Sequence, residues 1–314
     1  MVDHPRFPSL SSIQAFEAAA RHRSFARAGR ELGTTSASVS YHVKQLEAQI
    51  GVPLFRRLPH RVELTEAGAV IAREATDAFA GLRASFAKAA DLDESRLAVT
   101  TLPTFGTSWL IPRLGGFRRE HPDIRVELDL SDTAQDLAAG VFDLAIRNGH
   151  GQWRGLQATA LLPSVFMPLC APALLGSAAR LGAPEDRIDV PLLGRPDWWA
   201  LWFKASGSSR RPRPEQFGTR LAAEHLDIAA AIAGHGIAIG SPILFAGEIA
   251  AGRLVPAHDL VVGNGRAFWH VHAVARRDSN KIAKFKAWIV EEARQALAAA
   301  EGYLTQVIVV DQPV

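Results

Sequence analysis

The sequence predicts an α/β protein in which a small helical head, one long helix and a larger body follow one another. Three observations indicate this order. Apolar residues recur at helical spacing, with short breaks, over the first 50 residues. The stretch 66–91 contains no proline and is rich in alanine, which suits one long helix. From about residue 96, strand-like and helix-like segments alternate, as in a parallel sheet with crossover helices.

Length and composition limit the classes of protein to consider. A chain of 314 residues suits two or three domains, and no stretch approaches the roughly 18 consecutive apolar residues of a membrane span. The N-terminus lacks the charged and apolar regions of a secretory signal. The single cysteine, Cys170, excludes a disulfide framework and a multi-cysteine zinc site, and suits a small buried residue. We therefore expect a cytoplasmic protein that does not enter a membrane.

Charge is unevenly distributed along the chain. Residues 1–62 hold nine basic and four acidic side chains, whereas the whole chain carries a net charge of only +3. A basic head on a nearly neutral body predicts that the head alone binds a polyanion.

The first helix is expected over residues 12–22. Ser11 and Gln14 have the spacing of a capping box, and apolar residues follow at helical spacing.

A second helix, residues 25–32, follows almost at once. Ser24 can cap its start, and Gly33 can adopt the left-handed conformation that ends it. Thr35 or Ser36 then caps a third helix. The turn between these helices is only about three residues long and contains glycine, which is typical of a helix-turn-helix.

The third helix carries two different stripes. Its apolar stripe, expected to face the other two helices, consists of Val39, Val43, Leu46 and Ile50. Its second stripe is small, hydroxylated and basic, and consists of Ser36, Ala37, Ser40, Tyr41 and Lys44. Such a stripe lets a helix approach the wall of the DNA major groove and contact phosphates or base edges, so we expect these residues to bind DNA. An ordinary solvated face is the alternative.

A wing is expected after the third helix. The stretch 52–65 has a short extended pattern interrupted by Pro59, which predicts two short strands around a basic turn. The cations of this segment are Arg56, Arg57, His60 and Arg61, of which we expect the three arginines to contact the DNA backbone. A solvated loop is the alternative. Residues 1–65 are thus predicted to form a winged helix-turn-helix domain.

The long helix is expected to start at Glu66, capped by Thr65, and to reach about Asp91. Heptad-like spacing links Ile71, Ala75, Ala78, Leu82, Phe86 and Ala89. We interpret residues 66–92 as a linker that pairs two copies of the chain, with packing against its own head as the alternative.

The body is expected to span residues 93–305. Its first part reads as strands 97–102, 124–131 and 142–149, with helices 107–122 and 133–140 between them. Further on, we expect strands 164–171, 217–223, 236–240 and 267–275, a helix-rich section, and a closing helix 282–297.

These elements predict two α/β lobes joined by two crossing segments. Lobe I would comprise about 93–163 and 268–305, and lobe II about 164–267, with 306–314 as a tail of unassigned role. This is a periplasmic-binding-protein-like arrangement, which closes on a small ligand by a hinge motion.

Candidate ligand-binding residues follow the predicted strands, because ligands of parallel sheets lie beyond the carboxyl ends of the strands. In lobe I they are Thr100, Thr101, Thr104, Phe105, Ser131, Asp132, Thr133, Arg147 and Asn148. In lobe II they are Glu224 and His225, with His235 as a weaker candidate. Hydroxyls, free amides and an arginine suit a carboxylate-bearing effector, although capping or loop solvation would also explain each residue. Trp198, Trp199 and Trp202 could form a pocket wall or pack in the core.

No catalytic or cofactor motif stands out. The chain has no GxSxG, no P-loop and no GxGxxG at a strand–helix turn. His270 and His272 share a face of a predicted strand, but two histidines without a third ligand are weak evidence for a metal site. We therefore expect neither an enzyme nor a cofactor.

The chain resembles a known family. The run AGRELGTTSASVSYHVKQLEAQIGVPLFRR from Ala28, followed by VELTEAG, resembles the N-terminal domain of LysR-type transcriptional regulators. In the body, PTFGTSWLIPRLGGFRREHP, FDLAIRNGHGQWRGL, GHGIAI and IAAGRLV resemble the subgroup of the glycine cleavage system activator and the beta-lactamase regulator. The family often has Gln at Ser36 and Pro at Ala37, so the resemblance implies a different half-site.

The resemblance implies a DNA-binding regulator. Such a protein binds a pseudo-palindromic promoter site in double-stranded DNA as a homo-oligomer, a dimer or a tetramer, and responds to a small effector. RNA polymerase is a possible partner. Two alternatives remain open at this point: a constitutive repressor whose cleft has no ligand, and an enzyme or solute-binding protein with an appended helical domain.

Overall fold

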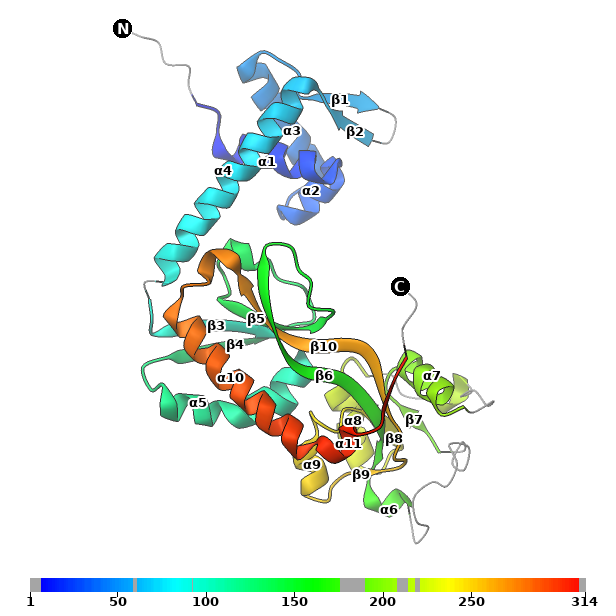
Figure 1. Cartoon of the computed structure of the whole chain (residues 1–314). Coiled ribbons are helices and arrows are strands. Elements are labelled where there is room, and N and C mark those ends of the chain that lie inside the picture. The colour runs from blue at the N-terminus through cyan, green and yellow to red at the C-terminus, as the bar shows by residue number, and fades with distance from the viewer. Residues whose placement is uncertain are drawn as a thin grey trace. The chain divides into compact units, whose positions relative to one another are not determined.

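The chain forms two compact units. A computed structural model describes residues 7–58, 61–91, 93–175, 190–207, 214–217 and 221–310. The division between the units falls after residue 86, so that most of the long helix belongs to the N-terminal unit (Figure 1).

The N-terminal unit is a winged helix-turn-helix followed by a long helix. Its elements in chain order are α1 (Leu10–His22), α2 (Phe25–Glu31), α3 (Ser36–Ile50), β1 (Phe55–Leu58), β2 (Arg61–Leu64) and α4 (Glu66–Asp91). The two strands pair antiparallel, with Phe55 opposite Leu64 and Leu58 opposite Arg61.

Helix caps explain where these helices begin. The capping box predicted at Ser11 is wrong, because the helix begins two residues before the expected start. Ser9 has extended backbone angles, and its hydroxyl accepts a hydrogen bond from the Ser12 amide at 3.1 Å. Ser24 and Thr35 cap the next two helices in the same way. Gly33, at φ 63°, makes the tight turn between them.

The core of this unit joins the wing to the helices. Phe16 of α1 and Val39 of α3 are fully buried, and Val43 nearly so. Phe55 of β1 lies 5.5 Å from the Phe16 ring and 5.4 Å from the Phe25 ring. Each aromatic side chain buried in this way contributes roughly 1.5–3 kcal/mol to stability, so the base of the wing is fixed against the helix-turn-helix.

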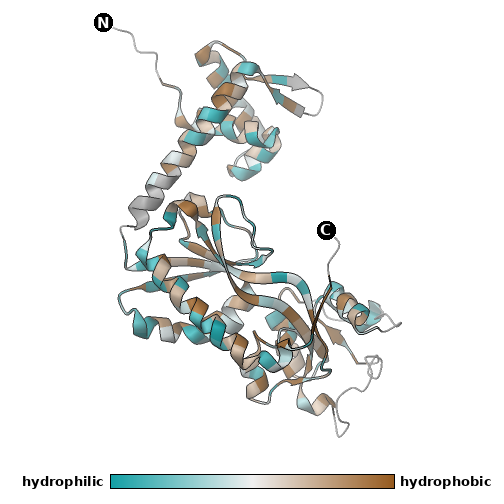
Figure 2. Ribbon diagram, in the orientation of Figure 1, coloured by the Kyte–Doolittle hydropathy of each residue, from teal (hydrophilic) through white to brown (hydrophobic). Residues whose placement is uncertain are grey.

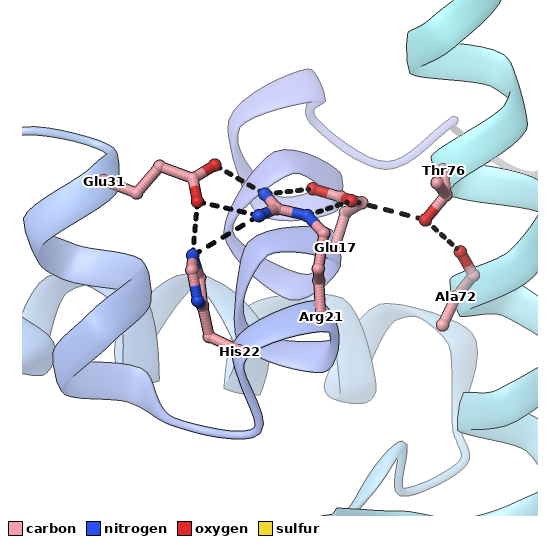
Figure 3. A network of polar contacts seen from close by, with 6 residues as sticks. All are labelled: Glu17, Arg21, His22, Glu31, Ala72 and Thr76. Atoms are coloured by element: carbon pink, nitrogen blue, oxygen red, sulfur yellow. Dashed lines mark hydrogen bonds and ion pairs between the residues drawn. The ribbon is translucent and has the colours of Figure 1, made fainter. Parts of the chain in front are cut away.

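A polar network ties α4 to the helix-turn-helix (Figure 3). The buried carboxylate of Glu17 accepts hydrogen bonds from Arg21 Nε at 3.1 Å and from Thr76 Oγ1 at 3.3 Å. Arg21 also forms an ion pair with Glu31 of α2, which contacts His22. The Glu17 carboxylate therefore joins α1 to α4, and Arg21 extends the network to Glu31 of α2.

The C-terminal unit is built on one curled sheet of mixed strands. Its strand order is β4-β3-β5-β10-β6-β8-β7, with β11 beside β10 and β9 beside β6. The strands are β3 (Arg96–Thr101), β4 (Arg125–Leu130), β5 (Leu144–Gly149), β6 (Leu156–Cys170), β7 (Leu192–Leu193), β8 (Ile237–Gly240), β9 (Val255–Pro256), β10 (Val261–Ala273) and β11 (Val307–Val309). β3 pairs in parallel with β4 and β5, as expected of crossover connections.

Two long strands connect the lobes. β6 and β10 span 15 and 13 residues and pair antiparallel with each other. The predicted lobe boundaries at 163/164 and 267/268 fall inside these strands. The predicted tail includes β11, which pairs in parallel with β10.

Helices cover the sheet. They are η1 (Phe105–Leu110), a π-helix, then η2 (Ile111–Arg113), α5 (Leu114–Glu120), η3 (Leu137–Ala139), α6 (Pro172–Leu175), α7 (Pro196–Ala205), η4 (Pro214–Gln216), α8 (Glu224–Ile232), α9 (Ala246–Ala250), η5 (Val274–Arg276), α10 (Asn280–Ala299) and α11 (Glu301–Leu304). Hydrophobic and hydrophilic residues alternate along α10 (Figure 2). Its buried residues include Phe285 and Ile289, which join the core over the sheet.

Two predicted elements are wrong. The helix expected at 133–140 is only the single turn of η3, because Asp136 caps that turn and Gly140, at φ 78°, ends it at once. The strand expected at 217–223 is not formed at 217 or at 221–223, and 218–220 lie outside the described residues. In its place, α8 begins at Glu224 after an extended Ala223.

Candidate functional site

The third helix presents the expected stripe to solvent. Ser36, Ala37, Tyr41 and Lys44 are exposed, and Ser40 is partly exposed. On the opposite face, Val39, Val43 and Leu46 are buried in the head. The first turn of α3 contains no acidic side chain, so the partial positive charge of its N-terminus is not offset by a carboxylate, although the Ser38 amide is capped by the Thr35 hydroxyl.

The wing carries one described cation. Arg56 of β1 is exposed. The backbones of Arg57 and Arg61 belong to β1 and β2, but their side chains lie outside the described part of the chain, as do Pro59 and His60.

The heptad-like stripe of α4 divides into two parts. Ile71 is partly buried and Ala75 is 6% exposed, because both lie against the head. Ala78 and Leu82 are exposed, and the side chains of Phe86 and Ala89 lie outside the described residues. The alternative of packing on the head thus applies to the first half of the stripe, whereas Ala78 and Leu82 of the second half face solvent.

A cleft of about 410 Å³ lies between the lobes of the C-terminal unit. Lobe I contributes Leu102, Thr104, Phe105, Asp132 and Asn148; lobe II contributes Arg195, Trp198, Leu221, Ala222, Ala223, Glu224 and Asp227; and the long strands contribute Ser164, Arg266 and Phe268. The volume is in the usual range for small-molecule sites.

Several candidates in lobe I bond to each other instead of facing the cleft. Arg147 donates to the carbonyl of Ser131 at 2.8 Å, the hydroxyl of Thr100 at 2.9 Å and the carbonyl of Thr133 at 3.2 Å. The Thr100 hydroxyl in turn donates to Asp129. Thr100 and Thr101 are 0% exposed. This cluster holds the ends of β3, β4 and β5 together, and none of its members lines the cleft.

One contact joins the lobes directly. Thr104 Oγ1 lies 3.3 Å from both Nδ1 and the backbone nitrogen of His225 at the start of α8. His225 itself borders a neighbouring concavity, and His235 is exposed. The Thr104 hydroxyl is therefore placed to respond to any movement of α8.

Two acids of α8 face the cleft one helical turn apart. Burial raises the pKa of Glu224 to about 7, although the Ser241 amide donates to its Oε1 at 2.8 Å. Burial also raises the pKa of Asp227 to about 6. Desolvation disfavours the charged form of both groups, and their mutual repulsion adds to this effect at Glu224.

The sequence did not identify ten of the cleft residues or left their role open, and five of these ten have charged or aromatic side chains. These five are Arg195, Trp198, Asp227, Arg266 and Phe268. Of the three tryptophans, Trp199 and Trp202 are buried, whereas the partly exposed Trp198 lines the cleft and stacks on Phe166 at 4.9 Å. Asp227 had a signal, since it is a charged residue on the apolar face of a helix beside Ile228 and Ala231.

A larger concavity of about 690 Å³ lies on the other side of α8. Its two arginines already form ion pairs, Arg113 with Glu292 and Arg253 with Glu248. The interlobe cleft is the better candidate, because it lies at the ends of the lobe I strands and contains a buried carboxylate oxygen, Oδ1 of Asp227, that no described residue hydrogen-bonds.

Known protein families and relatives match both units of the chain. The family model "LysR substrate binding domain" matches residues 90–294, and "Bacterial regulatory helix-turn-helix protein, lysR family" matches residues 10–69. The glycine cleavage system transcriptional activator of Escherichia coli strain K12 is 36% identical over 299 residues, or 92% of this chain and 95% of that protein. The transcriptional activator AmpR of Pseudomonas aeruginosa is 37% identical over 297 residues, or 92% and 97%.

A solved structure resembles the C-terminal unit. The effector domain of Pseudomonas aeruginosa AmpR superposes with a TM-score of 0.54 at 31% identity, covering 67% of this chain and 98% of that one. In the described residues, no helix is long and apolar enough to cross a membrane.

Proposed function

Because the chain belongs to the LysR family of bacterial transcriptional regulators, we propose that it binds a pseudo-palindromic promoter site as a homo-oligomer and senses a small metabolite in its interlobe cleft. It is a DNA-binding regulator with an effector-binding domain, and its relatives are regulators, not enzymes. The observation that carries the finer proposal is that one chain has both features: the solvent-facing stripe of α3, with no acid in the first turn of that helix, and the cleft between the lobes of the C-terminal unit.

DNA binding would use α3 in the major groove and the wing on the backbone. The candidates are Ser36, Ala37, Ser40, Tyr41 and Lys44 of α3, with Arg56, Arg57 and Arg61 of the wing. The small residues at the start of α3 permit close approach, and Lys44 and the arginines neutralise phosphates. Chromosomal DNA as a target would mean that the protein acts in the cytoplasm.

Two copies of the head are needed to read two half-sites. We propose that two copies of the chain pair through the exposed part of the α4 stripe, Ala78 and Leu82. A dimer or a tetramer would then set the spacing between heads, and RNA polymerase is a possible further partner.

Sensing would act through lobe closure. A ligand that contacts both walls of the cleft favours the closed arrangement, in which Thr104 and His225 meet. We propose a carboxylate-bearing effector. Thr104, Phe105 and Glu224 line the cleft, whereas Thr100, Thr101, Ser131, Thr133 and Arg147 would act by holding lobe I together and His225 through Thr104.

The test has two parts. In a mobility-shift assay, the full chain should retard a fragment of its own promoter, and the double change Ser40→Ala with Arg61→Ala should abolish the shift. In a thermal-shift screen against amino acids, small carboxylates, purines and cell-wall fragments, at least one class should raise Tm. DNA binding with no ligand in any class would favour a constitutive repressor instead, and an undiminished shift in the double variant would contradict the DNA-binding surface.

A further inference from the structure

The interlobe cleft contains a carboxylate that the protein itself does not satisfy. Asp227 is only 3% exposed, and its Oδ1 has no hydrogen-bond partner among the residues that the structure describes. A buried acceptor of this kind costs roughly 1–3 kcal/mol, and more when it is charged, so a native fold retains it where a ligand can pair with it.

A second acid lies beside it. Glu224 precedes Asp227 by three residues on α8, so the two side chains lie on one face of the helix and border the same cleft. Glu224 Oε1 accepts the Ser241 amide at 2.8 Å, which orients the carboxyl group but adds no positive charge.

One cation of the cleft attracts Glu224 but is hydrogen-bonded to a different acid. Arg195 lines the cleft, but its guanidinium bonds to both oxygens of Asp197, at 3.2 and 2.8 Å. The end of the cleft at α8 carries two acids, and burial raises the pKa of both, whereas attraction by Arg195 partly offsets this at Glu224.

The rest of the cleft has a different character. Arg266 of β10 is exposed at its rim, and Phe105 and Phe268 lie with ring centroids 5.0 Å apart along its wall. An anionic group of a ligand can pair with Arg266, and an apolar part can lie against the wall that contains Phe268.

We propose that the acid pair Glu224 and Asp227 is an ammonium-binding subsite, so that the effector carries a protonated amine in addition to its carboxylate. The inference rests on the proposed sensing function and specifies the chemical class of the ligand. A zwitterion such as an amino acid or a short peptide would place its ammonium between the carboxyl group of Glu224 and the Oδ1 of Asp227. Its carboxylate would lie toward Arg266.

An organic cation fits better than a metal ion. Within the described residues, no group of three or more His, Cys, Asp or Glu side chains is arranged to hold a metal. Two carboxyl groups beside an aromatic wall are too few ligands for Ca²⁺ or Mg²⁺, which need about six oxygens, but they suit an ammonium group with three donors.

The experiment is a thermal-shift and calorimetry screen of the full chain with matched probes. The zwitterionic set consists of free amino acids and dipeptides, and the comparison set consists of the same compounds with N-acetylated amines. We expect at least one zwitterion to raise Tm, and its N-acetyl derivative to bind at least about tenfold more weakly, because the neutral amide forms no ion pair.

Variants then test the residues. Asp227→Asn should remove the tenfold preference for the free amine, and Glu224→Gln should reduce it. Asp123→Asn is the matched control, since Asp123 is an exposed acid of the same unit that does not line the cleft, and it should retain the preference. Only variants with a wild-type mobility shift are compared, so that loss of fold is excluded.

The possible outcomes separate the two claims. Equal binding of free and acetylated compounds, or a preference unchanged in both Asp227→Asn and Glu224→Gln, would overturn the ammonium subsite while leaving effector sensing intact. Silence of every compound, with DNA binding present, would overturn the subsite and count against sensing as well. A loss of preference confined to the acid-pair variants would support it.

Discussion

Three buried titratable side chains of the C-terminal unit lack the partners that normally justify burial. Asp227 faces the cleft, where a ligand can supply a partner. His270 and His272 lie on β10, beneath α10, with ring centroids 5.4 Å apart. Neither ring nitrogen of His270 has a hydrogen-bond partner in the described part of the chain. Asp227 therefore bears on ligand binding, whereas the two buried histidines bear on stability.

His270 should make the C-terminal unit sensitive to acid. Burial lowers the pKa of His270 to about 3, and the nearby charges of His272 and Lys286 act in the same direction. Between pH 3 and about 6.5, the unfolded chain therefore binds more protons than the folded chain. Stability is complete above pH 6.5 and is lost as the pH falls, by up to about 1.4 kcal/mol per pH unit from this group.

The measurement is urea unfolding at pH 5 and pH 7, followed by tryptophan fluorescence. All seven tryptophans lie between residues 109 and 288, so the signal reports the C-terminal unit alone. We expect His270→Leu to reduce the loss of stability between the two pH values, and His235→Leu, at an exposed histidine, to leave it unchanged. Equal pH dependence in wild type and His270→Leu would contradict the assignment.

The candidate site could be predicted from the sequence only in part, for a reason visible at single residues. Position after a strand placed Thr104 and Phe105 at the cleft, but it could not show that Arg147 and Thr100 satisfy each other's hydrogen bonds. Trp198 and Trp199 are adjacent in the sequence, yet only Trp198 faces the cleft. Contacts between residues far apart in the chain decide these cases, and local patterns do not contain them.

Among the elements, helices with caps and apolar stripes were the most predictable. The long helix α4 has the bounds expected from Thr65 and the absence of proline. The residues 133–140 failed to form their expected helix because so short a segment gains too few internal hydrogen bonds to offset its nucleation, and η3 ends at Gly140. The lengths of β6 and β10 were underestimated, since their pairing partners lie far away in the sequence.

Helix α4 exposes an apolar side chain on its heptad-like stripe. Leu82 is 45% exposed on the stripe that continues beyond the head. We expect Leu82→Glu to weaken self-association at least about tenfold, because each copy would bury a charge in an apolar seam. The variant should also lose affinity for a DNA fragment with two half-sites more than for a fragment with one.

Analytical ultracentrifugation of the full chain measures this effect directly. Val70→Glu is the matched control, because Val70 is 60% exposed on the same helix but lies off the stripe. Self-association that is equally weakened by both changes, or by neither, would exclude the Ala78–Leu82 surface as the pairing surface.

At the scale of the whole molecule, the two units differ in charge and in the way they are held. The C-terminal unit fixes its own entry point, since Lys281 of α10 donates to the carbonyls of Asp93 and Arg96 at 3.0 and 2.9 Å and lies 3.3 Å from Asp143. The chain that arrives from α4 is thus anchored to lobe I beside β3.

The same segregation of charge predicts how salt affects the molecule. The basic surplus lies in residues 1–62, so DNA binding should release counterions, and log K should fall with log[salt] by about 0.9 for each phosphate neutralised.

Arg56→Ala should reduce the slope by about 1, because it removes one exposed wing cation. Arg277→Ala removes an equally exposed cation from the other unit and should leave the slope unchanged. These slopes are measured by fluorescence anisotropy of labelled promoter DNA while the salt concentration is varied about fourfold, from roughly 50 to 200 mM. A flat profile would show that binding neutralises no phosphates and would contradict the wing contact. Equal effects of the two arginines would instead show that the charge of the whole chain, rather than that of the head, governs the salt dependence.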